Sequence, residues 1–250
     1  GVHTCALPIL LLALLRLLAG PLAGFVEQLP HWTLALQVLA AASILTGSLV
    51  AIVQTTLKRR LAYSSIAHSG FMLAALSVIS GGQTAEAGGA LLFYLAFHLT
   101  AAFGLYAVVL MLSRHTGENP DIKRDLAGFG YRSPLAAAAF TALLLSYAGA
   151  PPTMGFFARF FILRPLLAAQ NIWLAVLVGV GMMIMLYYLL RIVVVMYTPA
   201  ESADGVEKVA HAYPFTLILA LMLAAALNLF MGIFPSGLLE AATKAAAALF

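Results

Sequence analysis

The sequence has few charged residues: Asp, Glu, Lys and Arg make up 9% of its 250 positions, whereas hydrophobic residues make up 63%. An ordinary soluble domain carries about 25% charged residues. A soluble fold has too little interior to hide this much apolar surface, so the solvent must be lipid. The scarcity of charge therefore excludes a soluble globular protein and indicates a membrane protein in contact with the lipid bilayer.

The sequence also has a single cysteine, Cys5, which excludes an internal disulfide and a cysteine-based metal site. It contains no phosphate-binding loop, no dinucleotide fingerprint, no metal-spaced His/Cys/Asp cluster and no nucleophile–base pair. We therefore expect no catalytic residue and no metal in this chain. The net charge of +4 comes from basic residues between apolar runs, so it is a topology signal and does not indicate nucleic acid binding.

What the sequence does have is long apolar runs, several of which reach the roughly 20 residues needed to cross a bilayer. Backbone groups in lipid must pair within the protein, so runs of this length predict helices and not a barrel. The prediction is an all-α, polytopic transmembrane helix bundle, with 1–250 as a single domain. About seven helices are expected, at 6–19, 32–54, 61–80, 89–112, 134–169, 172–196 and 213–235.

The start of the chain is unusual for such a protein. It begins at Gly1, and the helix at 6–19 is too short to span, so we expect a fragment or a processed chain. Residues 1–5, GVHTC, are less apolar than those that follow, and we expect them to be foreign or artefactual. No basic n-region precedes the first apolar run, so a signal peptide is not expected.

The segment 134–169 contains the stretch SYAGAPPTMGFFARFF, residues 146–161, which interrupts an apolar run with two glycines and two prolines. Each proline lacks a backbone N–H and clashes with the preceding turn, so nearby carbonyls lose their helical partners. Irregular backbone inside a membrane survives only against protein or a watery cavity, as at the ion sites of transporters. We predict a broken helix whose hinge is formed by Gly149, Pro151, Pro152 and Gly155.

The distribution of basic residues indicates how often this broken segment crosses the membrane. If it crosses once, the loops at 55–60, 113–133 and 197–212 share one side, while the opposite loops hold no Lys or Arg. This asymmetry is what the positive-inside rule expects, so we predict a single crossing, cytoplasmic basic loops and an external C-terminus. The cations gathered on one side are Lys58, Arg59, Arg60, Arg114, Lys123, Arg124, Arg132, Arg191 and Lys208.

Four residues are candidates for proton translocation: Arg159, His98, His68 and Lys58. An arginine in mid-helix costs about 2.5–3.5 kcal/mol on insertion scales, so it is usually functional or paired. The alternative is that Arg159 snorkels to an interface or merely caps carbonyls. A neutral histidine can relay a proton, but a packed histidine bonded to one carbonyl explains His98 equally well. For Lys58, anchoring to lipid headgroups is the favoured alternative.

Two stretches resemble a known family. Residues 57–76, LKRRLAYSSIAHSGFMLAAL, closely resemble the IKR-LAYSSI-H-G segment of the antiporter-like membrane subunits of respiratory complex I. Residues 125–160, DLAGFGYRSPLAAAAFTALLLSYAGAPPTMGFFARF, resemble their L-GL-RSP--A---T--LLSLAGIPPT-GF--KF segment. The order and spacing of both, and the following LYYLLRIVVVMY, resemble the family of NADH:quinone oxidoreductase subunit N, called subunit 2 in mitochondria. The resemblance covers roughly residues 6–235.

The resemblance implies a fourteen-helix subunit with two inverted five-helix repeats, each containing a broken helix. A chain of buried Lys, Glu and His would run along the membrane midplane. This chain would hold the second repeat, and would lack the first repeat with its glutamate and its lysine. A further family lysine would fall near Leu7, where this sequence has none.

The resemblance also implies an activity. The subunit would lie in the membrane arm of a proton-pumping NADH:quinone oxidoreductase, a translocase of the EC 7.1.1 type in the bacterial inner (plasma) membrane. It would help couple electron transfer from NADH to a quinone such as ubiquinone to proton translocation. This chain would bind no cofactor itself, since NADH, FMN, iron–sulfur clusters and quinone belong to partner subunits. Its partners would be the other membrane-arm subunits of complex I.

Arg159 departs from the family pattern, because it stands where the family has the lysine of GF--KF. A buried lysine can give up its proton, whereas an arginine effectively cannot. Our hypothesis is that Arg159 is a fixed cation that holds water and shifts the pKa of other groups. Protons would then move by water and by histidines such as His98.

Other functions remain as alternatives. The chain could be a subunit of a multisubunit Na⁺(cation)/H⁺ antiporter or of a membrane-bound hydrogenase, because the antiporter subunits share the first motif in looser form. It could also be a non-conducting scaffold that spaces the membrane arm. A seven-helix receptor is disfavoured, since its helices would not include the broken segment.

Overall fold

The computed structural model describes residues 13, 30–79, 84–116, 120–199 and 214–248. The predicted helix at 6–19, the residues 1–5, the position of the family lysine near Leu7, and Lys208 lie outside this description, apart from residue 13 itself.

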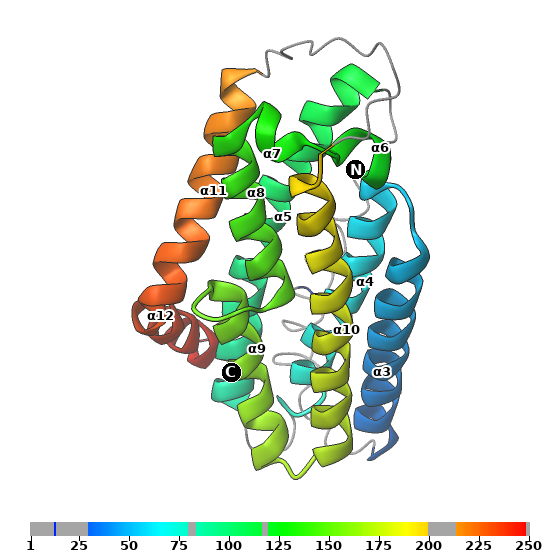
Figure 1. Ribbon diagram of the computed structural model, residues 1–250. Coiled ribbons are helices and arrows are strands. Elements are labelled where there is room, and N and C mark those ends of the chain that lie inside the picture. Colours follow the sequence, from blue (N-terminus) through cyan, green and yellow to red (C-terminus); the bar gives the residue numbers. More distant parts are fainter. Residues whose placement is uncertain (1–12, 14–29, 80–83, 117–119, 200–213, 249–250) are drawn as a thin grey trace.

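The described residues form an up-and-down bundle of helices, so the predicted all-α polytopic fold is confirmed (Figure 1). The N-terminal part consists of α3 (Pro30–Val53), α4 (Leu57–Leu76) and α5 (Thr84–Thr116). Two short helices follow, α6 (Ile122–Leu126) and α7 (Phe129–Arg132), and then α8 (Pro134–Ala148) and α9 (Met154–Ala168). The remainder is α10 (Ile172–Tyr197), α11 (Phe215–Ile233) and α12 (Pro235–Ala247).

Several predicted boundaries were wrong by a few residues. Helix α4 begins at Leu57 and not at residue 61, so its three cations belong to its first turn. Helix α5 extends from Thr84 to Thr116, beyond the predicted 89–112. Helix α12 was not predicted: it is a short, alanine-rich helix that begins at Pro235 and packs across α5. Its length of 13 residues is too short for the apolar-run criterion used to find spans.

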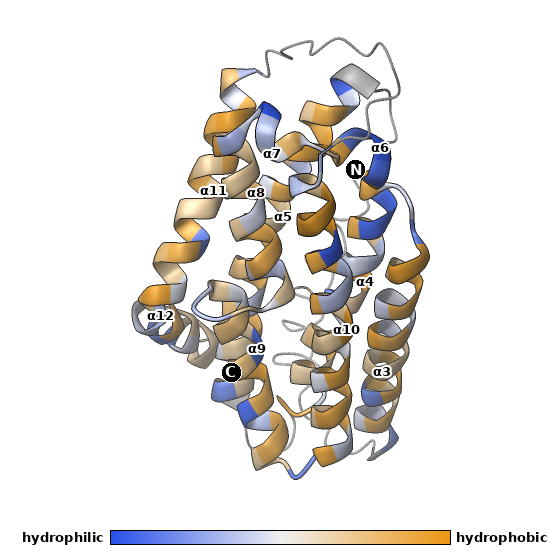
Figure 2. Ribbon diagram, viewed as in Figure 1, coloured by the Kyte–Doolittle hydropathy of each residue, from blue (hydrophilic) through white to orange (hydrophobic). Residues whose placement is uncertain are grey.

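Helices α8 and α9 follow one another along the bundle, so together they cross it once (Figure 1). The end of α3 and the starts of α4, α8 and α11 lie together at the upper end in that view, with α6 and α7. We call this the basic end. Figure 2 shows hydrophilic residues on α6 and on the adjoining turns of α4 there. The grouping of these cations at one end agrees with the prediction that the segment 134–169 crosses the membrane once.

Four described helices are long and apolar enough to cross a membrane: α3, α5, α10 and α11. Helix α4 is as long as a span but much less hydrophobic, because its first turn holds three cations and because it then carries Ser64, Ser65, His68 and Ser69. All four side chains are buried. Helix α4 lies among α3, α5 and α9, which cover it. The polar side chains of α4 therefore face the interior of the bundle, where other polar groups can meet them.

Candidate functional site

The candidate site is built around the break between α8 and α9. Helix α8 ends at Ala148, and Gly149 follows with φ +88°, in the left-handed region that favours glycine. The backbone N–H groups of Gly149 and Ala150 both donate to the Leu145 carbonyl, at 3.0 and 2.9 Å, which closes the last turn. Pro151 and Pro152 then carry the chain to the first turn of α9.

Gly155 lies within the first turn of α9 and not in the interruption itself. Its backbone N–H donates to the Ser146 hydroxyl at 3.3 Å. A Cβ at this position would overlap the Ser146 carbonyl. The structure therefore places the four predicted hinge residues around one break, and Gly155 is the residue that allows α9 to approach the end of α8 closely.

Arg159 lies one turn further along α9 and is completely buried. One guanidinium nitrogen, Nη2, donates to the Tyr147 carbonyl at 2.5 Å and contacts the Met185 sulfur at 3.2 Å. The other, Nη1, donates to the Gly155 carbonyl at 3.0 Å. The guanidinium carbon also lies 5.6 and 5.9 Å from the ring centroids of Phe71 and Phe97.

These contacts decide between the alternatives for where the Arg159 side chain lies. It does not snorkel to an interface, because its exposed fraction is 0%. It does cap a carbonyl in the last turn of α8, where the partial negative charge of the helix end favours a cation. The ion pairs found among the described residues do not include Arg159. Carbonyl dipoles, a sulfur and two aromatic faces therefore stabilise this buried charge.

A cluster of rings lies beside the break. We call it the histidine cluster: His68 from α4, Tyr94 and His98 from α5, and Tyr147 from α8. His68 Nδ1 is 2.7 Å from the Tyr94 hydroxyl. The ring centroids of His68 and His98 are 5.0 Å apart, and those of His68 and Tyr147 are 4.0 Å apart. All four residues are buried, so the structure brings the two predicted histidines together.

Each histidine keeps one ring nitrogen without a hydrogen-bonding partner in the described part of the chain. These atoms are His68 Nε2 and His98 Nδ1, and both are buried. A buried polar atom without a partner is costly. These two ring nitrogens are therefore able to form a hydrogen bond with a proton carrier or with a small polar species.

Hydroxyl groups continue from the histidine cluster along α4. The Tyr147 hydroxyl lies 3.3 Å from the Ser65 hydroxyl. One residue earlier, the Ser64 hydroxyl lies 2.8 Å from the Tyr188 hydroxyl and donates to the Arg60 carbonyl. These buried groups form a polar strip that leads from the cluster toward the basic end.

A second network of polar side chains connects the break between α8 and α9 to α11 and α5. Ser146 donates to the Asn228 side-chain oxygen at 3.0 Å, and Asn228 donates to the Thr100 hydroxyl at 3.2 Å. Helices α8, α11 and α5 are thus joined by three uncharged polar side chains. This network fixes the end of α8, and with it the carbonyl that Arg159 caps.

Lys58 does not belong to the histidine cluster. It lies in the first turn of α4, at the basic end, and is half-buried. It lines a groove of about 970 Å³ between α5 and α11, and His98 lines the same groove. Helix α5 advances about 1.5 Å per residue, so the groove covers roughly 22 Å between His98 and Ser113. Lys58 and His98 thus line the same apolar groove, but they lie far from each other along it.

Sequence reasoning missed several members of the site. Tyr147 and Tyr188 lie in apolar helices, and nothing in their local sequence distinguishes them from packed aromatic residues. Met185 and Asn228 were missed for the same reason. Tyr94 lies four residues before His98 on the same helix, so the sequence relates it to His98, whereas it bonds to His68 on another helix. Within the described residues, no group of three or more His, Cys, Asp or Glu could hold a metal ion.

An interrupted helix around a buried cation, in a bundle of membrane-length helices, defines the class of polytopic membrane proteins with discontinuous spans. The comparisons identify the family. Residues 7–185 match the family model described as NADH:quinone oxidoreductase/Mrp antiporter, TM. The chain belongs to this family.

Similar proteins agree with this assignment. The chain is 44% identical to NADH-quinone oxidoreductase subunit N 1 of Solibacter usitatus, over 86% of this chain and 42% of that protein. It is 38% identical to NADH-quinone oxidoreductase subunit N of Desulforamulus reducens, over 93% of this chain and 46% of that one. The chain thus spans less than half the length of these curated relatives.

Solved structures show the same fold. The chain resembles respiratory complex I from Thermus thermophilus with bound NADH, with a TM-score of 0.70 and 26% identity over 87% of this chain and 44% of that one. It also resembles the Mrp complex from Dietzia sp., with a TM-score of 0.82 and 22% identity over 97% of this chain and 51% of that one. The second likeness concerns the fold alone.

Proposed function

We propose that this chain is part of a membrane-arm subunit of a proton-pumping NADH:quinone oxidoreductase. The observation that carries the proposal is the completely buried Arg159 at the helix break, beside the paired His68 and His98. The names of the relatives support this proposal over other members of the family. The activity would be a translocase of the EC 7.1.1 type, and it would be a property of the assembled complex.

In this mechanism, the protein moves protons and does not carry electrons. NADH, FMN, iron–sulfur clusters and quinone would be bound by partner subunits, and this chain would bind no cofactor. Arg159 would keep its charge throughout, because a guanidinium does not deprotonate in proteins. The charge would order water at the break and bias the protonation of neighbouring groups. His68 and His98 would then pass the proton, with Tyr94 orienting the His68 ring through its hydroxyl.

Lys58 would act at the basic end of this route. The groove that it shares with His98 is mostly apolar, so we assign it no direct transfer to His98. The strip of hydroxyls from Tyr147 to Ser64 leads from the histidine cluster toward the first turn of α4, where Lys58 lies. We propose that the basic loops face the cytoplasm and that the membrane is the bacterial inner membrane, since cytoplasmic loops are enriched in Lys and Arg.

The experiment compares three forms of the assembled complex: the unmodified protein, Arg159→Lys and Arg159→Ala. Proton uptake per NADH oxidised is measured in sealed vesicles. We expect Arg159→Lys to pump, because it keeps a cation at the break, and Arg159→Ala to oxidise NADH with a clearly lower proton yield. If Arg159→Ala pumps as well as the unmodified protein, the site is structural and the proposed mechanism is wrong.

A second candidate is a subunit of a multisubunit cation/proton antiporter, because the description of the matching family model also names the Mrp antiporter. Purification from native membranes distinguishes the two. Co-purification of peripheral redox subunits supports the oxidoreductase. Sodium-dependent proton exchange by a complex without redox subunits would support the antiporter instead.

A further inference from the structure

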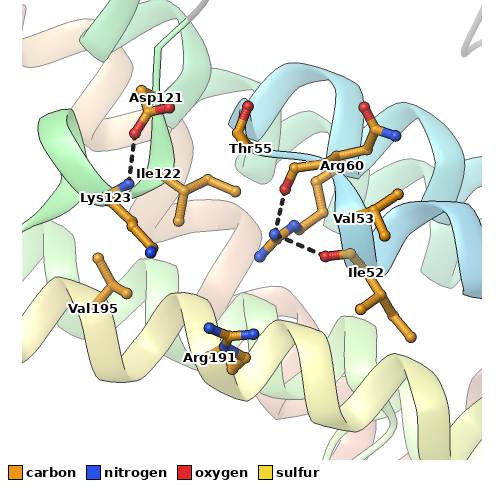
Figure 3. Close-up of a pocket in the computed structure, with 10 residues that line it drawn as sticks. Ile52, Val53, Thr55, Arg60, Asp121, Ile122, Lys123, Arg191 and Val195 are labelled. Carbon is orange, nitrogen blue, oxygen red and sulfur yellow. Dashed lines mark hydrogen bonds between the residues drawn. The ribbon is translucent and has the colours of Figure 1, made fainter.

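A second cluster of cations lies at the basic end, away from the histidine cluster. Arg60 from α4, Lys123 from α6 and Arg191 from α10 line one pocket of about 240 Å³. Figure 3 shows the side chains of Lys123 and Arg191 extending toward the space in front of the Arg60 guanidinium. We call these three residues the cation pocket. They come from three helices, so only the folded bundle brings them together.

The cation pocket has too few carboxylates to balance its charge. Asp121 is the only acidic residue among those that line it. Its Oδ1 is already occupied, because it accepts the backbone N–H groups of Lys123 and Arg124 at the start of α6. The ion pairs found in the described parts of the chain leave out all three pocket cations. Like charges this close repel one another unless an anion lies between them.

Hydrogen bonds hold the Arg60 side chain at the wall of the pocket, where it can meet such an anion. Its Nη2 donates to the Ile52 carbonyl at 3.4 Å and to the Gln54 carbonyl, which fixes the guanidinium at the end of α3. The residue is only 9% exposed. Its Nε is buried and makes no hydrogen bond to any described atom. A guanidinium that is held in one orientation at the wall of the pocket is suited to the tetrahedral oxygens of a phosphate group.

The walls of the pocket indicate the rest of the ligand. Ile52, Val53 and Val195 line it beside the three cations. Val53 is 72% exposed, so apolar surface adjoins the pocket on α3, and Val194, next to the lining residue Val195 on α10, is 65% exposed. Further exposed apolar side chains lie on these two packed helices, among them Leu45 and Leu49 on α3 and Leu190 on α10. A ligand with a charged head and an apolar tail fits both parts.

We propose that the cation pocket binds a phosphate group, and that this phosphate is the headgroup phosphate of an anionic phospholipid. Its acyl chains would lie along the exposed apolar surface of α3 and α10. Basic pockets between transmembrane helices are known to suit anionic headgroups. This site is separate from the histidine cluster, so it does not depend on the proposed proton transfer.

The test uses the assembled complex in phosphatidylcholine vesicles that contain a phosphatidylglycerol with a photoreactive acyl chain. After illumination, the labelled peptides are identified by mass spectrometry. We expect label on α3 and α10 in the unmodified protein. Each basic residue near an anionic lipid contributes about a fivefold gain in binding. Lys123→Gln and Arg191→Gln should therefore each lower this labelling about fivefold, and the double variant should lower it further.

The matched control is Arg59→Gln, which removes the same charge from the neighbouring residue. Arg59 is exposed and does not line the pocket, so labelling of α3 and α10 should stay unchanged. Equal labelling in the double variant and the unmodified protein would overturn the proposal. So would an absence of label on α3 and α10 in the unmodified complex, which would mean that another protein surface covers the pocket.

A second arm separates the two sources of phosphate. Inorganic phosphate is added to the unmodified complex, with chloride at matched ionic strength as the reference. Labelling that resists inorganic phosphate supports a site for lipid phosphate, as proposed. Labelling that falls with inorganic phosphate but not with chloride would still support a phosphate site, but would overturn its assignment to lipid alone. The single variants keep the test decisive if the double variant does not assemble.

Discussion

Arg159 and Arg60 are both buried arginines that donate to carbonyls at the carboxyl end of a helix. Arg159 caps α8 in the interior of the bundle, and Arg60 caps α3 at the basic end. They differ in their neighbours. Arg159 is enclosed by carbonyls, Met185 and aromatic rings, whereas Arg60 opens onto a pocket with two further cations.

This difference indicates different uses of the same side chain. A cation enclosed by dipoles keeps its charge without a mobile counter-ion, so it can set the electrostatic environment of nearby groups. A cation that faces others of the same sign is stabilised by an anion, which can come and go. Three substitutions, Gly155→Ala, Arg60→Met and Arg159→Met, each change one of these two regions.

The largest effect on stability is expected for Gly155→Ala, which changes the region around Arg159. A Cβ at Gly155 would overlap the Ser146 carbonyl, so α9 would have to move away from α8. Overpacking of this kind costs about 1–3 kcal/mol, and we expect the upper end, because the obstacle is backbone. The measurement is the free energy of unfolding in detergent micelles, together with the yield of assembled complex.

The control for Gly155→Ala is Gly179→Ala, on α10. A Cβ there would meet nothing within 4 Å. Because alanine is the better helix former by about 1 kcal/mol, this change should leave the protein equally or more stable. If both variants are equally stable, close approach of α9 to α8 does not matter for the fold.

An intermediate effect is expected for Arg60→Met. The change removes the donors to the carbonyls of Ile52 and Gln54, so the end of α3 loses its cap. Loss of such bonds should lower the free energy of unfolding by about 1–2 kcal/mol. The exposed neighbour Arg59, changed to Met, should stay within about 0.5 kcal/mol of the unmodified protein. Identical unfolding curves for the two variants would show that Arg60 does not cap α3.

The smallest effect on stability is expected for Arg159→Met, because two terms oppose each other. The change leaves the Tyr147 carbonyl buried without its partner, which costs about 1–3 kcal/mol. It also removes a charge whose placement in the membrane costs about 2.5–3.5 kcal/mol. The net change in the free energy of unfolding should be about 1 kcal/mol or less. A loss of more than about 3 kcal/mol would mean that Arg159 is chiefly a structural residue.

Much of the fold could be predicted from the sequence, because hydrophobicity along the chain determines where membrane helices lie. The break at Gly149–Gly155 was predicted because prolines and glycine have strong local effects on a helix. Helix α12 was missed because it is short. The start of α4 was placed too late because Lys58, Arg59 and Arg60 were assigned to a loop.

The candidate site was predicted only in part. Arg159 and the two histidines are conspicuous, because polar residues are rare in apolar runs. The bond between His68 and Tyr94 joins residues on different helices, so no local pattern contains it. The cation pocket was not predicted for the same reason: Arg60, Lys123 and Arg191 lie far apart in the sequence, where they counted only as cations on one side of the membrane.

The sequence by itself determined that the chain is a bundle of membrane helices, that one helix is broken, and that the break is followed by a permanent cation. These properties follow from composition and from the local effects of proline, glycine and arginine. Only the tertiary structure decided which carbonyls Arg159 caps, that His68 and His98 lie 5.0 Å apart, and that three distant cations share a pocket. The reason is physical: contacts between helices depend on how the helices pack, which local sequence does not specify.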